Sequence, residues 1–484
     1  QRPHRPHRPH RPAVSSRSSG ARDVSAPVTI DLRPHQLRWV SDVQTAFRTH
    51  RRVLGQAPTG MGKSACATVI LRDCTARNHR SLFVCELEEI ALDTHARLRA
   101  AGVDTGLIAG CAPRSPGAPV QVALVQSLAA MLRRGEPLPA ANRIIVDEAH
   151  NCSATEGGMY ASVLDRYPSA RILGVTATPC GGLPFDVLVP GPTVSELIAG
   201  GWLARVSVIG PAAEMPSYTL SQDPVDAWVA WSQMPAYARA ATAPGAPVAT
   251  LVFAANRTHA GQILEGFAAR GVAAELLTGA TPTAQRRGLR ERLTTGRTRV
   301  AVVVDAPWEG FDAPTVGCVI FARRVGSLRR WFQGTGRAMR CPPGSSKIAT
   351  VIDLTGSIHA HGLVTDPVTY SLDGEGMARV APPDLRRCSR CHALFGAADA
   401  IAGRCPLCGG GGAVDVRPWR VKRAEMFEQS TRPARERAED YLRTMVAVAA
   451  RAKVPEARRR AWAVAKSPEW VRVALTEGPA GGGV

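Results

Sequence analysis

Short apolar runs alternate with polar and amphipathic stretches along most of the chain, from Leu32 onward. The runs are Ser81–Cys85, Val120–Val125, Ile144–Val146, Ile172–Val175, Thr250–Phe253, Ala274–Leu277, Val300–Val304, Cys318–Phe321 and Thr350–Asp353. Largely apolar strands, each followed by a loop and often by a helical segment, are typical of a parallel sheet covered by crossover helices. The pattern therefore predicts two consecutive α/β units joined near Val206. A loop and helix over Ser217–Arg239 are expected to precede the second sheet.

Composition shifts divide the chain into five expected regions. The first 23 residues contain three Arg-Pro-His repeats and almost nothing apolar, so they cannot form a core. Whether this basic arm contacts nucleic acid or is a start-site artefact stays open. The expected regions are a disordered arm at 1–26, an α/β domain at 27–205, a second at 206–384, a cysteine-containing ribbon at 385–412 and a basic helical region at 413–484.

Charge and composition narrow the class of protein. The 484 residues are 45% hydrophobic and 21% charged, which is typical of a folded globular chain. Sixty Lys and Arg against forty Asp and Glu give a net charge of +20, which favours a polyanionic partner such as nucleic acid. No stretch reaches the ~20 apolar residues of a membrane span, and no secretory leader is recognised. Eight of the twelve Cys are scattered, which indicates a reducing, cytoplasmic location.

A loop of small residues follows the apolar pair Val53-Leu54 and precedes a helical segment. Such a loop directs backbone N–H groups and a helix N-terminus at phosphate, while Lys63 reaches the β- and γ-phosphates and Ser64 coordinates Mg²⁺. The residues expected to bind the nucleotide are Pro58, Thr59, Gly60, Met61, Gly62, Lys63 and Ser64. The strict P-loop pattern has Gly in place of Ala57, and an ordinary glycine-rich turn is the alternative.

Two acidic residues, Asp147 and Glu148, end the apolar run Ile144–Val146 and are followed by Ala149 and His150. Ligands of α/β proteins bind at the carboxyl edge of the sheet. We therefore expect Asp147 to hold Mg²⁺ and Glu148 to orient and deprotonate the attacking water. The alternative is the solvated start of a helix, which the position of the pair after a P-loop in the same unit disfavours.

With these motifs in this order, the sequence resembles the superfamily-two helicases and translocases over residues 32–372. The resemblance implies an α/β fold of two tandem RecA-like domains, an ATP-binding domain and a helicase C-terminal domain. It implies that Gln36 contacts the adenine base, although His35 stands where an aromatic residue is usual. It further implies that Gly174–Pro179 couples the nucleotide to the nucleic-acid strand. The segment Cys85–Glu89 is a poor match to the strand-binding loop of the family, because its acids would repel phosphate.

The second unit carries two further motifs of the family. Glu309–Pro314 resembles its coupling motif and implies nucleotide contacts from Gly310 and Asp312. The segment from Gln333 to Arg340 fits the pattern QxxGRxxR. Arg337 and Arg340 share one helical face because they are three residues apart. The resemblance implies that Gln333, Arg337 and Arg340 belong to the catalytic set, with both arginines acting in cis on the γ-phosphoryl group. A solvated helix face is the alternative for such a pair alone.

Two CxxC pairs, Cys388/Cys391 and Cys405/Cys408, are separated by thirteen residues. Four thiolates at this spacing can bind one Zn²⁺ tetrahedrally in a structural zinc ribbon. Redox dithiol and disulfide interpretations remain as alternatives, and His392 could replace one thiolate.

The C-terminal part narrows the resemblance. Asp353–Gly356, His361-Gly362 and Ser371–Gly374, followed by the cysteine pairs, resemble the RadD-like bacterial DNA-repair helicases, and phage-encoded relatives fit as well. The short spacing between Asp312 and Gln333 leaves no room for the long hairpin of the DEAH-box RNA helicases, which favours DNA over RNA. Aromatic residues among cations in the basic region suit single-stranded nucleic acid. An amphipathic helix with a solvated basic face explains that region equally well.

The sequence as a whole predicts a nucleoid-associated, ATP-dependent DNA helicase or translocase that acts in DNA repair or recombination. The expected cofactors are ATP, Mg²⁺ and Zn²⁺, and the expected form is a monomer. Nucleic acid is the expected partner, with a single-strand-binding or repair protein as a further candidate and no membrane association. The alternatives are a non-unwinding DNA translocase or remodeller, an RNA helicase, and a non-catalytic DNA-binding module carried on a degenerate motor.

Overall fold

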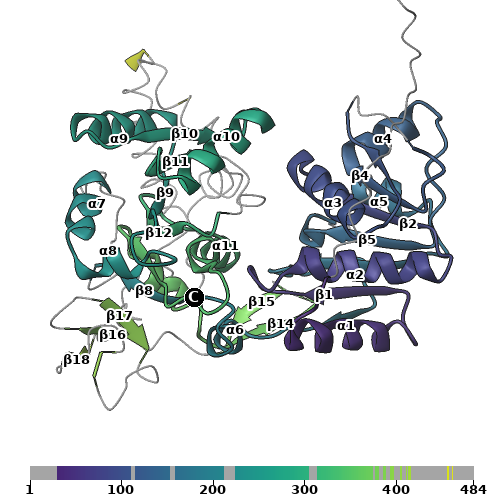
Figure 1. Ribbon diagram of the computed structural model, residues 1–484, viewed down its shortest axis with the longest axis horizontal. Coiled ribbons are helices and arrows are strands. Elements are labelled where there is room, and N and C mark those ends of the chain that lie inside the picture. The colour runs from purple at the N-terminus through teal and green to yellow at the C-terminus, as the bar shows by residue number, and fades with distance from the viewer. Residues whose placement is uncertain are drawn as a thin grey trace, which may run out of the picture. The chain divides into compact units, whose positions relative to one another are not determined.

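The computed structural model divides the chain into two compact units (Figure 1). Unit 1 comprises Gln1–Pro192 with Tyr370–Gly376, and unit 2 comprises Thr193–Thr369 with Met377–Val484. The described residues are 30–110, 115–152, 158–211, 224–304, 313–373, 376–380, 385–388, 393–396, 404–405, 410, 413–415, 455–456 and 461. The expected basic arm and nearly all of the expected basic helical region lie outside them.

Unit 1 is built on a seven-stranded sheet with the order β3-β4-β2-β5-β6-β1-β7, and all its strand pairs are parallel. The strands are β1 Arg52–Gln56, β2 Ser81–Cys85, β3 Thr105–Ile108, β4 Val120–Leu124, β5 Arg143–Asp147, β6 Arg171–Thr176 and β7 Val187–Val189. The helices are α1 Pro34–Ala46, α2 Lys63–Ala76, α3 Glu88–Ala100, α4 Val125–Arg133 and α5 Met159–Leu164, with a 3₁₀ turn at Ala149–Asn151.

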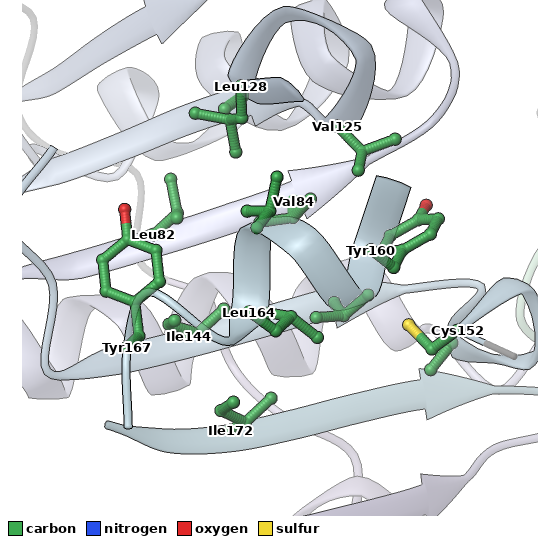
Figure 2. Close-up of a cluster of buried hydrophobic side chains, with 14 of the residues drawn as sticks. Leu82, Val84, Val125, Leu128, Ile144, Cys152, Tyr160, Leu164, Tyr167 and Ile172 are labelled. Carbon is green, nitrogen blue, oxygen red and sulfur yellow. The ribbon is translucent and has the colours of Figure 1, made fainter. Parts of the chain in front are cut away.

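Helices α4 and α5 cover one face of this sheet (Figure 2). Side chains of the central strands, such as Leu82 and Val84, pack there against Val125 and Leu128 of α4 and against Leu164 of α5. Successive strand residues point to opposite faces, so the alternate side chains of the same strands face the other helices. Burial on both faces explains why these strands are nearly continuous apolar runs.

Helix α1 lies against β1 on the opposite face of the sheet. A Cβ built on Gly55 would lie 2.4 Å from Cζ2 of Trp39, so the absence of a side chain at Gly55 is what admits the indole. Leu54 faces the core cluster with α4 and α5, and Gly55, as the next residue, faces the other way. Trp39 is 2% exposed and fixes the helix that carries Gln36.

Unit 2 contains a nine-stranded sheet with the order β10-β11-β9-β12-β13-β8-β17-β16-β18. Its strands are β8 Arg205–Ile209, β9 Ala249–Phe253, β10 Ala274–Thr278, β11 Val300–Val304, β12 Val316–Phe321, β13 Ile348–Asp353, β16 Leu385–Cys388, β17 Ala393–Gly396 and β18 Ala413–Asp415. A separate pair is formed by β14 Val368–Tyr370 and β15 Met377–Arg379. The helices are α6 Val194–Ala199, α7 Pro224–Ser232, α8 Pro235–Arg239, α9 Arg257–Ala269, α10 Thr283–Thr294, α11 Leu328–Met339 and α12 Ser357–His361.

Two tryptophans of α7 bind this helix to the second sheet. The indole N–H of Trp228 donates to Oγ1 of Thr250 on β9 at 2.9 Å, and that of Trp231 donates to Oγ1 of Thr350 on β13 at 3.2 Å. Both tryptophans are buried within the core cluster of unit 2. Their buried donors are thus satisfied by strand hydroxyl groups, which holds α7 in register over the sheet.

The predicted α/β fold with RecA-like parallel sheets is confirmed, and every predicted apolar run lies on an observed strand. The expected helix within Ser217–Arg239 is present as α7 and α8. Strands β16 and β17, in the expected ribbon, pair antiparallel and continue the unit 2 sheet, since β17 pairs with β8. Strand β18, which pairs antiparallel with β16, lies at the start of the region that was expected to be helical. Among the helices that the structure describes, none combines the length and apolarity needed to cross a bilayer.

Candidate nucleotide-hydrolysis site

The loop between β1 and α2 has the backbone of a phosphate cradle. Gly60 and Gly62 have φ values of 87° and 95°, a region that residues with a side chain rarely adopt. A Cβ on Gly62 would also lie 2.2 Å from Nε2 of Gln36. Helix α2 begins at Lys63 with Gly62 as its N-cap and no capping side chain. This arrangement directs backbone N–H groups toward an anion in front of the helix.

Ala57, which departs from the strict P-loop pattern, fits this loop without strain. Positive φ values are confined to glycines, Asn78 and Glu148 in the described part of the chain, so Ala57 does not need the freedom of Gly. Its N–H donates to the carbonyl of Thr176 at 2.8 Å, and its side chain is fully buried. The loop is therefore fastened to the end of β6 at its first residue.

Gln36 is attached to the same loop. Its Nε2 donates to the carbonyl of Met61 at 2.8 Å, and its Oε1 accepts from the N–H of Arg33 at 2.8 Å. His35 lies beside it, with Nε2 3.4 Å from the same Met61 carbonyl, and burial lowers the pKa of this histidine. Gln36, the residue expected to contact the adenine base, is thus hydrogen-bonded directly to the phosphate loop.

The carboxylate of Glu148 lies between Lys63 and His150. Nζ of Lys63 is 3.0 Å from Oε1, and Nδ1 of His150 is 3.3 Å from Oε2. The same Nδ1 lies 3.0 Å from Oγ1 of Thr176 at the end of β6, and that hydroxyl oxygen accepts the N–H of Thr178 at 3.1 Å. A continuous chain of contacts therefore links the phosphate loop to the segment after β6.

Electrostatics and backbone strain both single out Glu148. Burial disfavours its charged form, but the positive charge of Lys63 and the contact with His150 outweigh this and lower its pKa to about 2. Its φ of 48° and ψ of 50° place a residue with a side chain in the left-handed region, which costs roughly 1–2 kcal/mol. Strain of this kind is concentrated at functional sites, where surrounding contacts maintain it.

The two residues expected to hold Mg²⁺ come from the same edge of the sheet. Ser64 is exposed in the first turn of α2, and Asp147 is the last residue of β5. Strands β1 and β5 flank β6 in a parallel arrangement, so their carboxyl ends lie at one edge. A hydroxyl and a carboxylate are hard oxygen donors of the type that Mg²⁺ prefers. The donor set therefore fits this ion.

In unit 2, helix α11 carries Gln333 and Arg337 but ends at Met339, so the prediction that Arg337 and Arg340 share one helical face is wrong. Gln333 and Arg337 are each 6% exposed, and Arg340 follows the last residue of the helix in extended conformation. The burial of Arg337 argues against the alternative of a solvated helix face, because a side chain on such a face would be exposed. Arginine is seldom fully buried. Gly310 and Asp312, expected to contact the nucleotide, lie outside the described residues.

Sequence reasoning missed the roles of His150 and Thr176. Both stood within recognised motifs, but nothing in their spacing of 26 residues indicated that the imidazole and the hydroxyl meet.

Only two of the four cysteines predicted to bind zinc are among the described residues. Cys388 ends β16 and is 0% exposed, and Cys405 is 3% exposed, whereas Cys391 and Cys408 lie outside the described residues. Among the residues that are described, no group of three metal-binding side chains comes together.

Comparison with known families and proteins agrees with this site. Residues 29–180 match the family described as type III restriction enzyme, res subunit, and residues 244–342 match the helicase conserved C-terminal domain. A 51.5 kDa protein of Lactococcus phage (isolate 7-9) is 27% identical over 376 residues, which cover 73% of this chain and 77% of that protein. The "Putative ATP-dependent helicase IRC3" of Saccharomyces cerevisiae is 23% identical over 386 residues, covering 72% of this chain and 55% of the yeast protein.

A solved structure supports the fold. The fragment of a "putative HsdR subunit of a type I restriction enzyme" from Vibrio vulnificus YJ016 is similar with a TM-score of 0.52 and 19% identity, covering 70% of this chain and 69% of that one. The two matched families divide between the two units in the order found in helicase motors, ATP-binding domain first. With the phosphate loop, Asp147-Glu148, Arg337 and Arg340 in place, these two matches support assignment of the chain to the superfamily-two helicases.

Proposed function

We propose that the protein is an ATP-dependent DNA helicase or translocase. The observation that carries the proposal is the chain of contacts from Lys63 through Glu148 and His150 to Thr176. This series of contacts joins the loop expected to bind phosphate to Gly174–Pro179, the segment that the resemblance implies couples the nucleotide to the nucleic-acid strand. A nucleotide-binding module without a motor would not need that connection.

The ion pair between Lys63 and Glu148 suggests how phosphate binding activates the base. A carboxylate with a pKa near 2 accepts a proton poorly. When the β- and γ-phosphates attract Lys63, Glu148 loses the cation that lowers its pKa, so the pKa rises and the carboxylate becomes a stronger base for water. Ser64 and Asp147 would hold Mg²⁺, which would supply charge neutralisation on the phosphates.

His150 provides the second part of the mechanism. It contacts Oε2 of Glu148 and Oγ1 of Thr176 with the same ring nitrogen, so it orients the carboxylate while sensing the end of β6. Arg337 and Arg340 act in cis on the charge that develops on the γ-phosphoryl group. Hydrolysis transfers the γ-phosphoryl group to water, and once inorganic phosphate and the proton taken up by Glu148 have left, Lys63 pairs with Glu148 again.

DNA is the proposed track, and repair or recombination the proposed process, on the strength of the RadD-like sequence pattern and the net charge of +20. A structural zinc ribbon formed by Cys388, Cys391, Cys405 and Cys408 is part of the same proposal. Its support is the motif spacing together with the burial of Cys388 and Cys405, because structural zinc ligands are enclosed thiolates.

The test is steady-state ATP hydrolysis by the wild type and Lys63→Ala, without nucleic acid and with single-stranded DNA, duplex DNA or RNA at several salt concentrations. We expect DNA to stimulate the wild type, the stimulation to fall with salt as phosphate-dominated binding requires, and Lys63→Ala to lose at least ~10²-fold in kcat. Elemental analysis of the same preparation should find about one Zn²⁺ per chain.

Each outcome has a defined meaning. Unchanged stimulated hydrolysis by Lys63→Ala refutes the mechanism. Preferential stimulation by RNA assigns the RNA-helicase alternative, and no turnover with any polymer assigns the non-catalytic module. Strand displacement on a forked duplex, measured beside triplex displacement, separates unwinding from translocation. Absence of zinc from protein purified without chelator overturns the ribbon.

A further inference from the structure

A buried lysine of unit 2 binds three backbone carbonyl oxygens. Nζ of Lys347 donates to the carbonyls of Pro314 at 2.8 Å, Val316 at 2.7 Å and Arg340 at 2.7 Å. Lys347 is 2% exposed. An ammonium group has three N–H donors, so this site uses its full capacity. The buried ammonium of Lys347 is therefore stabilised by backbone carbonyls and not by a carboxylate.

The three carbonyls belong to two segments that carry helicase motifs. Arg340 follows the last residue of α11, where helix carbonyls lack partners within the helix and a positive charge is favourable. Pro314 ends the segment Glu309–Pro314, and Val316 begins β12. Lys347 therefore connects the end of the arginine-bearing helix with the end of the coupling motif.

Other contacts hold the end of α11 but do not make this connection. The N–H of Ala204 donates to the carbonyl of Met339 at 2.8 Å, and Leu203 forms an isolated β-bridge with Arg340. The indole N–H of Trp331 donates to the carbonyl of Gly362 at 2.9 Å. None of these three contacts reaches residues 314–316. Helix α11 also packs against β12 through the rings of Trp331 and Phe321. The ammonium of Lys347 adds a hydrogen-bonded link between the end of the helix and residues 314–316.

We propose that Lys347 is a positioning residue for ATP hydrolysis, whose ammonium holds the end of α11 against the coupling motif and so fixes the orientation of Arg337 and Arg340. The proposal rests on the proposed function, because it concerns the rate at which those arginines act. All three N–H donors of Lys347 bind backbone carbonyls, so its proposed effect on hydrolysis is exerted through the arginines.

The charge state of Lys347 makes this role measurable. Burial lowers its pKa to about 7; the Cys341 thiol raises it, and the charge of Arg340 lowers it. A neutral amine keeps two donors and turns a lone pair toward a carbonyl oxygen, which weakens the connection. Hydrolysis that depends on the ammonium therefore falls as pH rises through about 7.

Stability changes in the opposite direction. The folded-state pKa of Lys347 lies below its ordinary value of 10.5, so between about pH 7 and 10.5 the unfolded chain holds a proton that the folded chain lacks. The free energy of unfolding contributed by this group therefore rises with pH across that window. A lysine with a purely structural role would not produce a falling rate together with a rising stability.

The experiment compares wild type, Lys347→Met and Ser345→Ala in full-length protein. Lys347→Met keeps an unbranched chain without donors or charge. Ser345→Ala is the matched control, because it removes the bond from Ser345 Oγ to the carbonyl of Thr242 and the bond that this Oγ accepts from the backbone N–H of Lys347, but none of the three bonds of the ammonium. DNA-stimulated kcat and KM for ATP and the midpoint of denaturation are measured from pH 6 to 9, beside Lys63→Ala.

For Lys347→Met we expect kcat at pH 6.5 to fall about tenfold with the KM for ATP changed less than about twofold, as for a lost charge-assisted hydrogen bond. The difference in rate from wild type should shrink as pH rises, and the difference in stability should change in the favour of wild type. Ser345→Ala should keep the wild-type kcat and its pH profile.

Two results overturn the proposal. One is a kcat for Lys347→Met equal to wild type across the pH range, and the other is an equal loss of rate at every pH. Either result leaves the proposed function intact if wild type hydrolyses ATP and Lys63→Ala does not. If wild type shows no hydrolysis with any nucleic acid, the proposed function has failed, and the proposal for Lys347 falls with it.

Discussion

Each unit contains a functionally placed lysine, and the two lysines differ in the kind of partner they bind. Lys63 in unit 1 pairs with the carboxylate of Glu148, and both side chains are partly accessible, at 18% and 14%. Lys347 in unit 2 binds three backbone carbonyls and is 2% exposed. A phosphate can replace a carboxylate as the partner of an accessible ammonium. A backbone carbonyl within packed structure has no such freedom.

The difference separates an exchangeable contact from a permanent one. In the proposed mechanism, exchange at Lys63 raises the pKa of Glu148, so that the binding of phosphate makes this carboxylate a stronger base. In the proposed role of Lys347, its fixed contacts keep the end of α11 in one orientation while ATP is hydrolysed. The proposed mechanism needs both kinds of contact. The ammonium of Lys63 changes its partner during the cycle, and the helix that carries Arg337 has to stay in place while it does so.

The largest expected effect comes from Arg337→Ala, which tests whether unit 2 contributes to the chemistry at all. Loss of a cis arginine finger is expected to lower kcat by about 10³–10⁵-fold, with nucleotide affinity largely retained. Single-turnover ATP hydrolysis measures it. Arg330→Ala on the same helix is the control, because that residue is exposed. A decrease below tenfold would confine catalysis to unit 1.

An intermediate effect is expected for Gly62→Ala, which tests how tightly the loop of unit 1 packs. The left-handed φ of 95° costs an alanine roughly 1–2 kcal/mol. In addition, its Cβ would lie 2.2 Å from Nε2 of Gln36. We expect ATP to bind at least about tenfold more weakly, as measured by nucleotide titration.

Gly135→Ala separates these two causes. Gly135 has a φ of 70° but no atom within 4 Å of an added Cβ, so it carries the backbone cost alone. It should lower thermal stability and leave nucleotide affinity unchanged. Equal affinities for Gly62→Ala and wild type would mean that the contact between Gln36 and the loop has no part in binding.

The smallest effect is expected for Thr176→Val, which removes the last contact in the series from Lys63 through Glu148 and His150 to Thr176. Its Oγ1 lies 3.0 Å from Nδ1 of His150 and accepts the N–H of Thr178. Loss of such bonds costs roughly 1 kcal/mol each. We expect the stimulation of hydrolysis by DNA to fall about fivefold while the unstimulated rate changes less. Thr75→Val, which removes a hydroxyl bond within α2, should leave the stimulation unaltered.

Much of the fold could be predicted from local patterns. The run Val300–Val304 is strand β11 without a change of bounds, and Ser81–Cys85 is strand β2. Strands β3 and β7 were missed because Thr105–Ile108 contains a polar residue and a glycine, and Val187–Val189 is only three residues long. Short or interrupted runs do not rise above the background of apolar residues in loops.

The candidate catalytic residues were recognisable for the same reason as the strands. The P-loop, Asp147-Glu148 and the QxxGRxxR segment are contiguous motifs, and each depends on neighbouring residues within one turn, strand or helix. The contact of Gln36 with Met61 was not recognisable, because one partner is a backbone carbonyl. Every residue has such a carbonyl, so its use leaves no mark in the sequence.

The sequence by itself determined the order of most elements, the two RecA-like units and the candidate residues for the ATP chemistry, since these follow from short-range periodicity and spacing. Only the tertiary structure decided which groups those residues meet. Lys63 and Glu148 are 85 residues apart, and Lys347 reaches carbonyls 7, 31 and 33 residues away. The path of the folded backbone and the need to satisfy a buried charge determine these partners. Neither factor can be recognised from a local sequence pattern.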